Sequence, residues 1–223
     1  MDSPRRTPYA GETVTDPNVD KDGPSRGTSS SLLERVRAQD RAAWERLVSL
    51  YGPLVYGWCR RTGLRSQDAE DVGQEVFAAV HRKVAVFRRD RQGDSFRGWL
   101  RTITMNKIRD LARRRRTQAE GDAGETQQRL VESAAQPEDD SDARADPTET
   151  VVLAHRALDL LRDEFTKEKW HVFHRVVVEG EAPADVATAL GISVNTVYLT
   201  KSRGLRRLRE EFAGLLDLDE VHS

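Results

Sequence analysis

Apolar residues recur at helical spacing through residues 29–116, and this pattern predicts four helices. Ser31 is a suitable N-cap for the first helix. Gly52 and Pro53 are expected to end one helical period and start another, because proline lacks the amide hydrogen that a helix needs. A polar loop spans 87–95, and Asp94 or Ser95 can cap the last and longest helix, which runs to residue 116. The stretch is predicted to be a helical bundle.

A second helical stretch is predicted over residues 151–213. One of its faces is formed by Val151, Ala154, Leu158, Leu161 and Phe165, and another by Trp170, Phe173 and Val177. The run of three valines at 176–178 continues a helical phase, and no convincing two-residue alternation typical of strands appears elsewhere in the chain. The predicted fold class is therefore all-α, with two helical domains.

The segments outside these two stretches are polar and show no apolar period. Residues 1–28 are rich in Pro, Gly, Ser, Thr and Asp and are predicted to be a disordered tail, and residues 214–223 are a short C-terminal tail. Residues 117–150 hold ten acids and two arginines, a net charge of −8, and are expected to form a flexible linker that its own charge keeps extended. The domains are therefore 29–116 and 151–213.

The near-neutral net charge of −1 hides a strong local asymmetry. Residues 97–116 hold eight basic residues and one acid, a net charge of +7, which is typical of a nucleic-acid-binding surface. A solvated charged face would explain the same run, so charge alone does not decide. The acidic run "DAEDVGQEVF" at 68–77 raises a similar choice, because its acids could balance the basic helix or face a separate partner.

The sharpest local signal is a helix-turn-helix pattern at residues 182–209. A short apolar helix is followed by Gly191 at the turn, Ile192 as a plug between helices, and Ser193 as the cap of a basic second helix. In such units the second helix lies in the DNA major groove. An ordinary helical hairpin would lack this agreement of turn, plug, cap and basic face. Helical phase places Val194, Val197, Leu205, Leu208 and Phe212 toward the core.

Aromatic and basic residues alternate around 87–101, a pattern that can bind unstacked bases of single-stranded nucleic acid. The spacing of Phe96 and Trp99 favours burial in the core, whereas Phe87 fits either interpretation. Enzymatic interpretations have less support. His171 and His174 lack a third metal ligand, Asp71 with Glu75 lacks the partners of a nuclease site, and Cys59 lies in an apolar helix where an inert thiol is expected. We therefore expect no enzyme activity, no cofactor and no metal.

No apolar run reaches the roughly 18 residues of a membrane helix, and the polar N-terminus does not look like a signal peptide. With a single cysteine, a cytoplasmic location is expected.

Taken in order, three segments resemble those of a bacterial RNA polymerase sigma factor of the extracytoplasmic-function (ECF) group in the sigma-70 family. "DAEDVGQEVF" is similar to the helix that binds core polymerase. "FRGWLRTITMNKIRDLARRRR" is similar to the helix that reads the minus-ten element, and "GISVNTVYLTKSRGLRRLREEF" to the unit that reads the minus-thirty-five element. Gly73 stands where the family more often has an apolar residue.

The resemblance implies a site for each segment. Core polymerase, through its clamp helices, would be bound by Asp68, Asp71, Gln74 and Glu75. The melted minus-ten strand would be read by Phe87, Arg88, Arg89, Arg91, Ser95, Arg97, Asn106 and Arg113. The duplex minus-thirty-five element would be read by Asn195, Thr196, Tyr198, Leu199, Lys201, Ser202, Arg203 and Arg206. The second domain would also meet the polymerase flap, and an anti-sigma factor is a further candidate partner.

The expected function is thus a sigma factor that directs promoter recognition, melting and transcription initiation. The main alternative is an autonomous helix-turn-helix regulator whose N-terminal bundle dimerises or senses a signal. It leaves the acidic face of 68–77 without a role, and it predicts tight duplex binding without polymerase. A nuclease or recombinase would need a nucleophile or metal cluster that the sequence does not offer.

Overall fold

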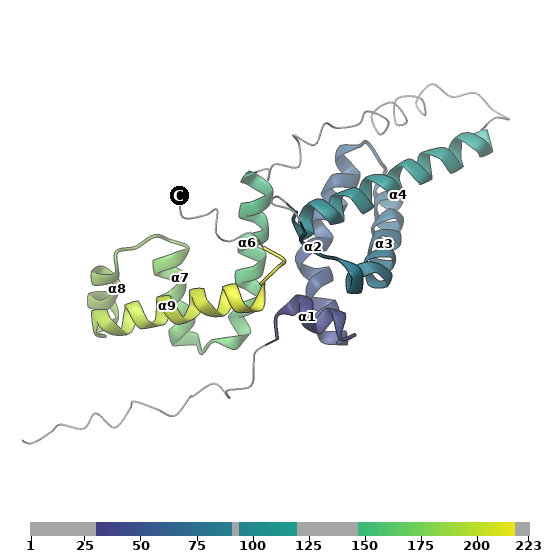
Figure 1. Ribbon diagram of the computed structural model, residues 1–223. Helices are drawn as coiled ribbons and strands as arrows, with labels where there is room; N and C mark the ends of the chain where they lie inside the picture. Colours follow the sequence, from purple (N-terminus) through teal and green to yellow (C-terminus); the bar gives the residue numbers. More distant parts are fainter. Residues whose placement is uncertain (1–29, 91–93, 120–146, 217–223) are drawn as a thin grey trace, which may run out of the picture.

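The computed structural model describes residues 30–90, 94–119 and 147–216. The predicted N-terminal tail, residues 217–223, most of the predicted linker, and Arg91 lie outside these residues. The predicted C-terminal tail begins too early at residue 214, because Leu215 is buried in the core. In the N-terminal half the elements are α1 (Leu32–Arg37), α2 (Arg41–Arg61), α3 (Ser66–Lys83), the 3-10 turn η1 (Val84–Val86) and α4 (Phe96–Ala119). Helix α4 extends past the end of α3, away from the rest of the molecule (Figure 1).

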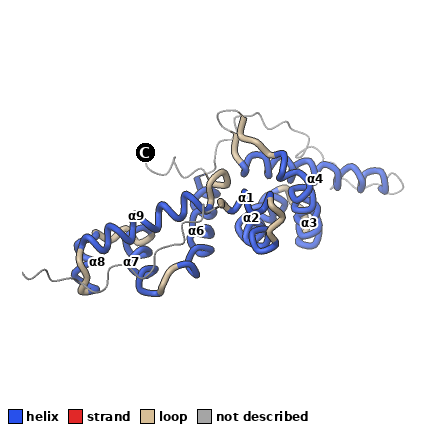
Figure 2. Tube along the Cα trace, turned by 60° about the horizontal axis from the view of Figure 1, so that its bottom comes forward, coloured by secondary structure: helices blue, strands red, loops and turns tan. Residues whose placement is uncertain are grey.

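The C-terminal elements are α6 (Pro147–Leu161), η3 (Arg162–Glu164), α7 (Lys167–Val177), α8 (Pro183–Leu190) and α9 (Val194–Glu211). Helix α6 lies beside α2, and α8 with the start of α9 lies at the end of the molecule farthest from α4 (Figures 1 and 2). Every described element is helical, so the all-α prediction is confirmed.

Side-chain caps begin the helices at several predicted residues. Ser31 and Glu34 form a reciprocal capping box at α1. At α4 the Ser95 Oγ accepts a hydrogen bond from the Gly98 amide at 3.0 Å. At α9 the Ser193 Oγ accepts one from the Thr196 amide at 3.1 Å. Gly191 ends α8 with φ 64°, a left-handed conformation that glycine adopts without strain. The predicted helix-turn-helix geometry is present.

The predicted break at Gly52 and Pro53 is wrong, because α2 continues through both residues. Proline costs an isolated helix roughly 3 kcal/mol, partly because the carbonyl four residues earlier loses its donor. Here that carbonyl belongs to Ser49, and the Arg156 guanidinium of α6 donates to it from Nε at 3.1 Å and from Nη2 at 2.9 Å. Tertiary contacts from the second half of the chain therefore accommodate the proline.

The buried face of α6 also differs from the prediction. Leu153, Ala157 and Leu161 are buried, whereas Val151 is 55% exposed. The helix starts at Pro147, inside the predicted linker. Packing on α2 decides which face of α6 is buried, and the apolar period of α6 alone does not reveal that packing.

The C-terminal end of α9 and the residues after it pack on the N-terminal half. Leu208, Phe212 and Leu215 belong to one apolar cluster with α1–α4. The Tyr51 hydroxyl donates to the Leu215 carbonyl at 2.5 Å.

A buried carboxylate also connects the N-terminal and C-terminal halves. Glu211 is fully buried and pairs with Arg35 at 3.5 Å, Arg46 at 3.3 Å and Arg207 at 3.0 Å. Arg46 and Arg207 also pair with Glu164, at 3.1 Å and 2.7 Å. Because an unpaired charge is expensive to bury, this network ties α1 and α2 to the C-terminal helices.

A smaller core holds the helix-turn-helix unit together. Val172 and Val176 of α7, Val186 and Ala187 of α8, and Val197 of α9 form it, with Ile192 packed on its edge as predicted. Val194, predicted to face the core, is 40% exposed. Close approach of α7 and α9 depends on Gly204, whose missing side chain leaves room for the Phe173 ring.

Candidate polymerase and promoter interfaces

The four predicted polymerase-binding residues of α3 divide into two pairs. Asp71 and Gln74 are exposed. Asp68 and Glu75 instead face α4: Asp68 pairs with Arg115, and Glu75 pairs with Arg114 at 2.9 Å and Lys107 at 3.2 Å. Asp68 and Glu75 therefore balance part of the charge of the basic helix, whereas Asp71 and Gln74 face solvent.

The electrostatic environment of Glu75 follows from these contacts. The hydrogen bond from Arg114, assisted by Lys107, lowers the pKa of the Glu75 carboxyl below its usual 4.5, against the opposing effect of partial burial. Glu75 is thus held as an anion, and its single negative charge offsets one of the two positive charges that Lys107 and Arg114 place beside it. The basic charge left exposed on α4 includes Arg113 and Arg116.

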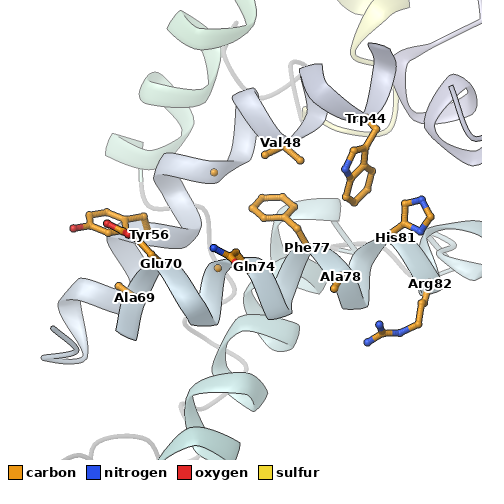
Figure 3. Close-up of a pocket in the computed structure, with 12 residues that line it drawn as sticks. Trp44, Val48, Tyr56, Ala69, Glu70, Gln74, Phe77, Ala78, His81 and Arg82 are labelled. Atoms are coloured by element: carbon orange, nitrogen blue, oxygen red, sulfur yellow. The ribbon is translucent and has the colours of Figure 1, made fainter. Parts of the chain in front are cut away.

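A groove of about 800 Å³ lies between α2 and α3, next to Gln74. Trp44 and Val48 project into it from α2 and Phe77 from α3, as Figure 3 shows. The Trp44 ring meets Phe77 edge-on, with ring centroids 6.3 Å apart. Gly52 and Gly73 line the groove too, and a Cβ atom added to either glycine would meet no atom within 4 Å. The glycines therefore keep the groove open, a role that the sequence pattern did not indicate.

The predicted minus-ten residues lie in the loop before α4 and along α4 as far as Arg113, and they differ in exposure. Phe87 is buried against Phe96 and Trp99, with ring centroids 5.3 Å and 5.0 Å away. Ser95 is used as the helix cap. The exposed members of the set are Arg88 and Arg89 in the loop and Asn106 and Arg113 on α4. Phe96 is buried and Trp99 packs on the same core, as their spacing favoured.

Arg97, also predicted to bind the minus-ten strand, is held by a residue of the other half of the chain. Its Nη1 donates to Glu149 Oε2 at 3.2 Å. The indole nitrogen of Trp58 donates to Glu149 Oε1 at 2.7 Å, and Arg61 donates to the same oxygen at 2.5 Å. Sequence reasoning missed this cluster because Glu149 stands in an acidic segment. The only available signal was Pro147, a favoured first residue of a helix.

The predicted minus-thirty-five residues gather on the outer face of α9. Val197, Gly204 and Leu208 are buried on the opposite face. The exposed residues of the set are Asn195, Thr196, Tyr198, Leu199, Ser202, Arg203 and Arg206, and Lys201 is half-buried. Tyr198 and Leu199 are exposed by 55% and 46%, which is unusual for large apolar side chains and is typical of a binding surface.

The residues considered for catalysis have ordinary structural surroundings. Cys59 is buried, and loss of solvent raises the pKa of its thiol to about 11, so it stays protonated. His174 contacts Glu179 at 3.1 Å and the Trp170 ring. Among the residues that the structure describes, no three His, Cys, Asp or Glu side chains are placed to share a metal ion. None of the described helices is long and apolar enough to span a membrane.

Comparison with known proteins identifies the family. The Sigma-70 region 2 family matches residues 47–118. Over 183 residues the chain is 32% identical to the ECF RNA polymerase sigma factor SigE of Mycolicibacterium smegmatis, covering 78% of this chain and 64% of that protein. Over 192 residues it is 30% identical to the RNA polymerase sigma factor CarQ of Myxococcus xanthus, covering 84% of this chain and 98% of that protein.

A third relative, the RNA polymerase sigma factor NccH of Alcaligenes xylosoxydans, is 28% identical over 210 residues and matches 93% of this chain and all of its own length. These matches run through both helical halves. The chain therefore belongs to the ECF group of the sigma-70 family of RNA polymerase sigma factors.

Proposed function

We propose that this sigma factor divides promoter recognition between its two helical halves, with α9 reading the minus-thirty-five element in the duplex major groove. The observation that carries the proposal is the composition of the exposed α9 face. Asn195 and Arg203 are side chains that can form paired hydrogen bonds with base edges, and Thr196 and Ser202 suit phosphates. The capped N-terminus of α9 lies at the far end of the molecule, where α6 and α2 do not cover it (Figure 1).

Docking on core polymerase is assigned to α3 and the neighbouring groove. Asp71 and Gln74 are exposed at this surface. Apolar side chains of the clamp helices would bind in the groove, against Trp44 and Phe77. Two exposed acids, Glu70 in the groove lining and Asp71 next to it on α3, suit the basic partner that the family resemblance implies. Asp68 and Glu75 contribute indirectly, because their ion pairs with α4 fix the position of α3.

The minus-ten element, as a melted strand, is assigned to α4 and the loop before it. Exposed Arg88, Arg89 and Arg113 would follow its phosphates, and Asn106 would meet a base. Phe87 reaches a base only if the aromatic cluster opens. The protein would act without a catalytic site of its own, in the cytoplasm beside the polymerase, and an anti-sigma factor could compete for the same surfaces.

The central test is transcription by purified core polymerase on a promoter library, with and without the protein. We expect promoter-specific initiation that depends on it. Arg203→Ala should lower initiation about 5- to 150-fold at promoters with the preferred upstream element, the range for one bidentate base contact. Arg209→Ala removes the same charge from an exposed position near the other end of α9 and should change little. If the free protein bound promoter duplex as tightly as its complex with polymerase does, the result would instead support an autonomous regulator.

Docking is tested separately by filling the groove. In Gly73→Leu the new side chain enters open space, so the fold should persist while core polymerase binding weakens at least tenfold. Gln67→Leu adds the same side chain at an exposed position of α3 outside the groove and serves as the control. Unchanged polymerase affinity for folded Gly73→Leu would remove the groove from the docking surface.

A further inference from the structure

The Glu149 carboxylate lies in a site made entirely of hydrogen-bond donors from the N-terminal half. Arg61 and Trp58 come from α2, and Arg97 comes from α4. Glu149 itself is only 5% exposed, Trp58 is 1% exposed, and the Arg97 side chain is 12% exposed. The two guanidinium groups carry one more charge than the carboxylate neutralises, so the site is built for an anion.

The chemistry of this site suits a phosphodiester as well as a carboxylate. Both ligands carry one negative charge and offer two oxygens that accept hydrogen bonds in a plane, and guanidinium groups bind both through paired N–H donors. Arg97 belongs to the segment predicted to contact the melted minus-ten strand, and it stands one residue after the start of α4. The position of the site therefore places it beside the path proposed for that strand.

We propose that Trp58, Arg61 and Arg97 form a backbone-phosphate site for the promoter strand, and that Glu149 occupies this site while the protein is free of DNA. The inference rests on the proposed function, because it takes the minus-ten strand as the ligand. Glu149 thus acts as an internal competitor, and DNA reaches the site when the carboxylate leaves.

The placement of Glu149 in α6 allows this exchange without undocking the two halves. It stands in the first turn of α6, where helices unwind most readily. Val151 and Val152 are exposed, and from Thr148 onward the first buried apolar side chain of α6 is Leu153. Unwinding of one turn therefore frees Arg61 and Arg97 while Leu153, Ala157 and Leu161 stay packed on α2.

The test measures how the free protein binds a single-stranded oligodeoxynucleotide that carries the minus-ten sequence found by the transcription screen. Glu149→Gln removes the competing charge, and fluorescence anisotropy should show affinity at least tenfold above wild type. The dependence of affinity on salt should become steeper, with the logarithmic slope changing by about 0.7 for each additional phosphate that the protein neutralises. Asp159→Asn, an acid-to-amide change at an exposed position of the same helix, should behave as wild type.

Adding Arg61→Gln to Glu149→Gln should return both the affinity and the slope to their wild-type values, because the phosphate site then lacks a donor. A folded Glu149→Gln protein, judged by helical circular dichroism, that matches Asp159→Asn in affinity and slope would overturn the inference. If Glu149→Gln unfolds, the single variant Arg61→Gln is tested in the complex with polymerase. The inference requires the logarithmic salt slope of its promoter binding to be smaller than that of wild type by about 0.7. An unchanged slope refutes the inference.

Wild-type transcription separates this inference from the proposed function. No promoter-specific initiation with core polymerase would refute the proposed function itself. Normal initiation by wild type, with no effect of the Glu149 and Arg61 changes on salt slope, would refute only the phosphate site.

Discussion

Gly204 lies where α7 and α9 approach most closely, and its replacement by alanine gives a sharp test of the second core. An added Cβ atom would lie 2.3 Å from Cε2 and 2.4 Å from Cδ2 of the Phe173 ring. Ordinary carbon contacts begin near 3.4 Å, so the ring must move by about 1 Å. It has little room, because Phe173 is fully buried and stacks on Phe165 at 5.5 Å and beside Trp170 at 6.0 Å.

The expected cost follows from two opposing effects. Overpacking a core by one methyl group costs about 1–3 kcal/mol, and the short contact distances place Gly204→Ala at the upper end. Alanine recovers up to about 1 kcal/mol of helix propensity relative to glycine. The net loss in free energy of unfolding is therefore about 2 kcal/mol, or roughly 4–8 °C in melting temperature for a protein of this size.

Thermal and urea unfolding followed by circular dichroism would measure this loss. Gly73→Ala is the matched control, because it lies inside α3 and its new Cβ meets no atom within 4 Å, so it should raise stability by about 0.5–1 kcal/mol. The reasoning is refuted if Gly204→Ala is as stable as wild type or gains stability in the way that Gly73→Ala does.

Three smaller predictions concern other parts of the fold. Because Arg114 lowers the pKa of Glu75, the stability that Glu75 adds is complete above about pH 4.5 and is lost as the pH falls through the lower folded-state pKa. The difference in unfolding free energy between wild type and Glu75→Gln, under about 1 kcal/mol at neutral pH for so exposed a pair, should therefore vanish in acid, and a constant difference would contradict this. Cys59 should react with iodoacetamide at mildly alkaline pH only as fast as the protein unfolds, since burial raises its thiol pKa to about 11; rapid labelling of the native protein would be inconsistent. Ser193→Ala should cost about 1 kcal/mol in thermal unfolding by removing the α9 cap, and no loss would show that the cap contributes nothing.

The sequence predicted features that depend on neighbouring residues. Caps at Ser31 and Ser193 and the glycine turn at Gly191 involve contacts across three or four residues, so short motifs suffice to find them. The continuation of α2 through Pro53 and the buried face of α6 were predicted wrongly. The buried face of α6 and the donor to the Ser49 carbonyl beside Pro53 both depend on contact between the two halves, about 100 residues apart in the chain, and helical periodicity carries no information about that contact.

The same distinction applies to the candidate sites. The outer face of α9 was predictable, because its buried residues repeat at helical spacing and leave the polar ones outside. The pairing of Asp68 and Glu75 with α4 was not, since it requires the relative placement of two helices. The burial of Glu149 was least predictable. It is one of ten acids in a polar segment, and no sequence motif distinguishes it from the other nine.

The contact between Arg156 and the Ser49 carbonyl bears on the order in which the chain folds. During synthesis α1–α4 leave the ribosome first, and the carbonyl that Pro53 deprives of its helical donor must then be hydrated by water. When α6 arrives, its guanidinium replaces that water. The N-terminal half can therefore fold with α2 complete in shape, and docking of the second half becomes a late exchange of one polar partner for another. At this carbonyl, docking therefore costs no hydrogen bond, and the attachment of the two halves rests on the shared apolar core and the Glu211 ion pairs.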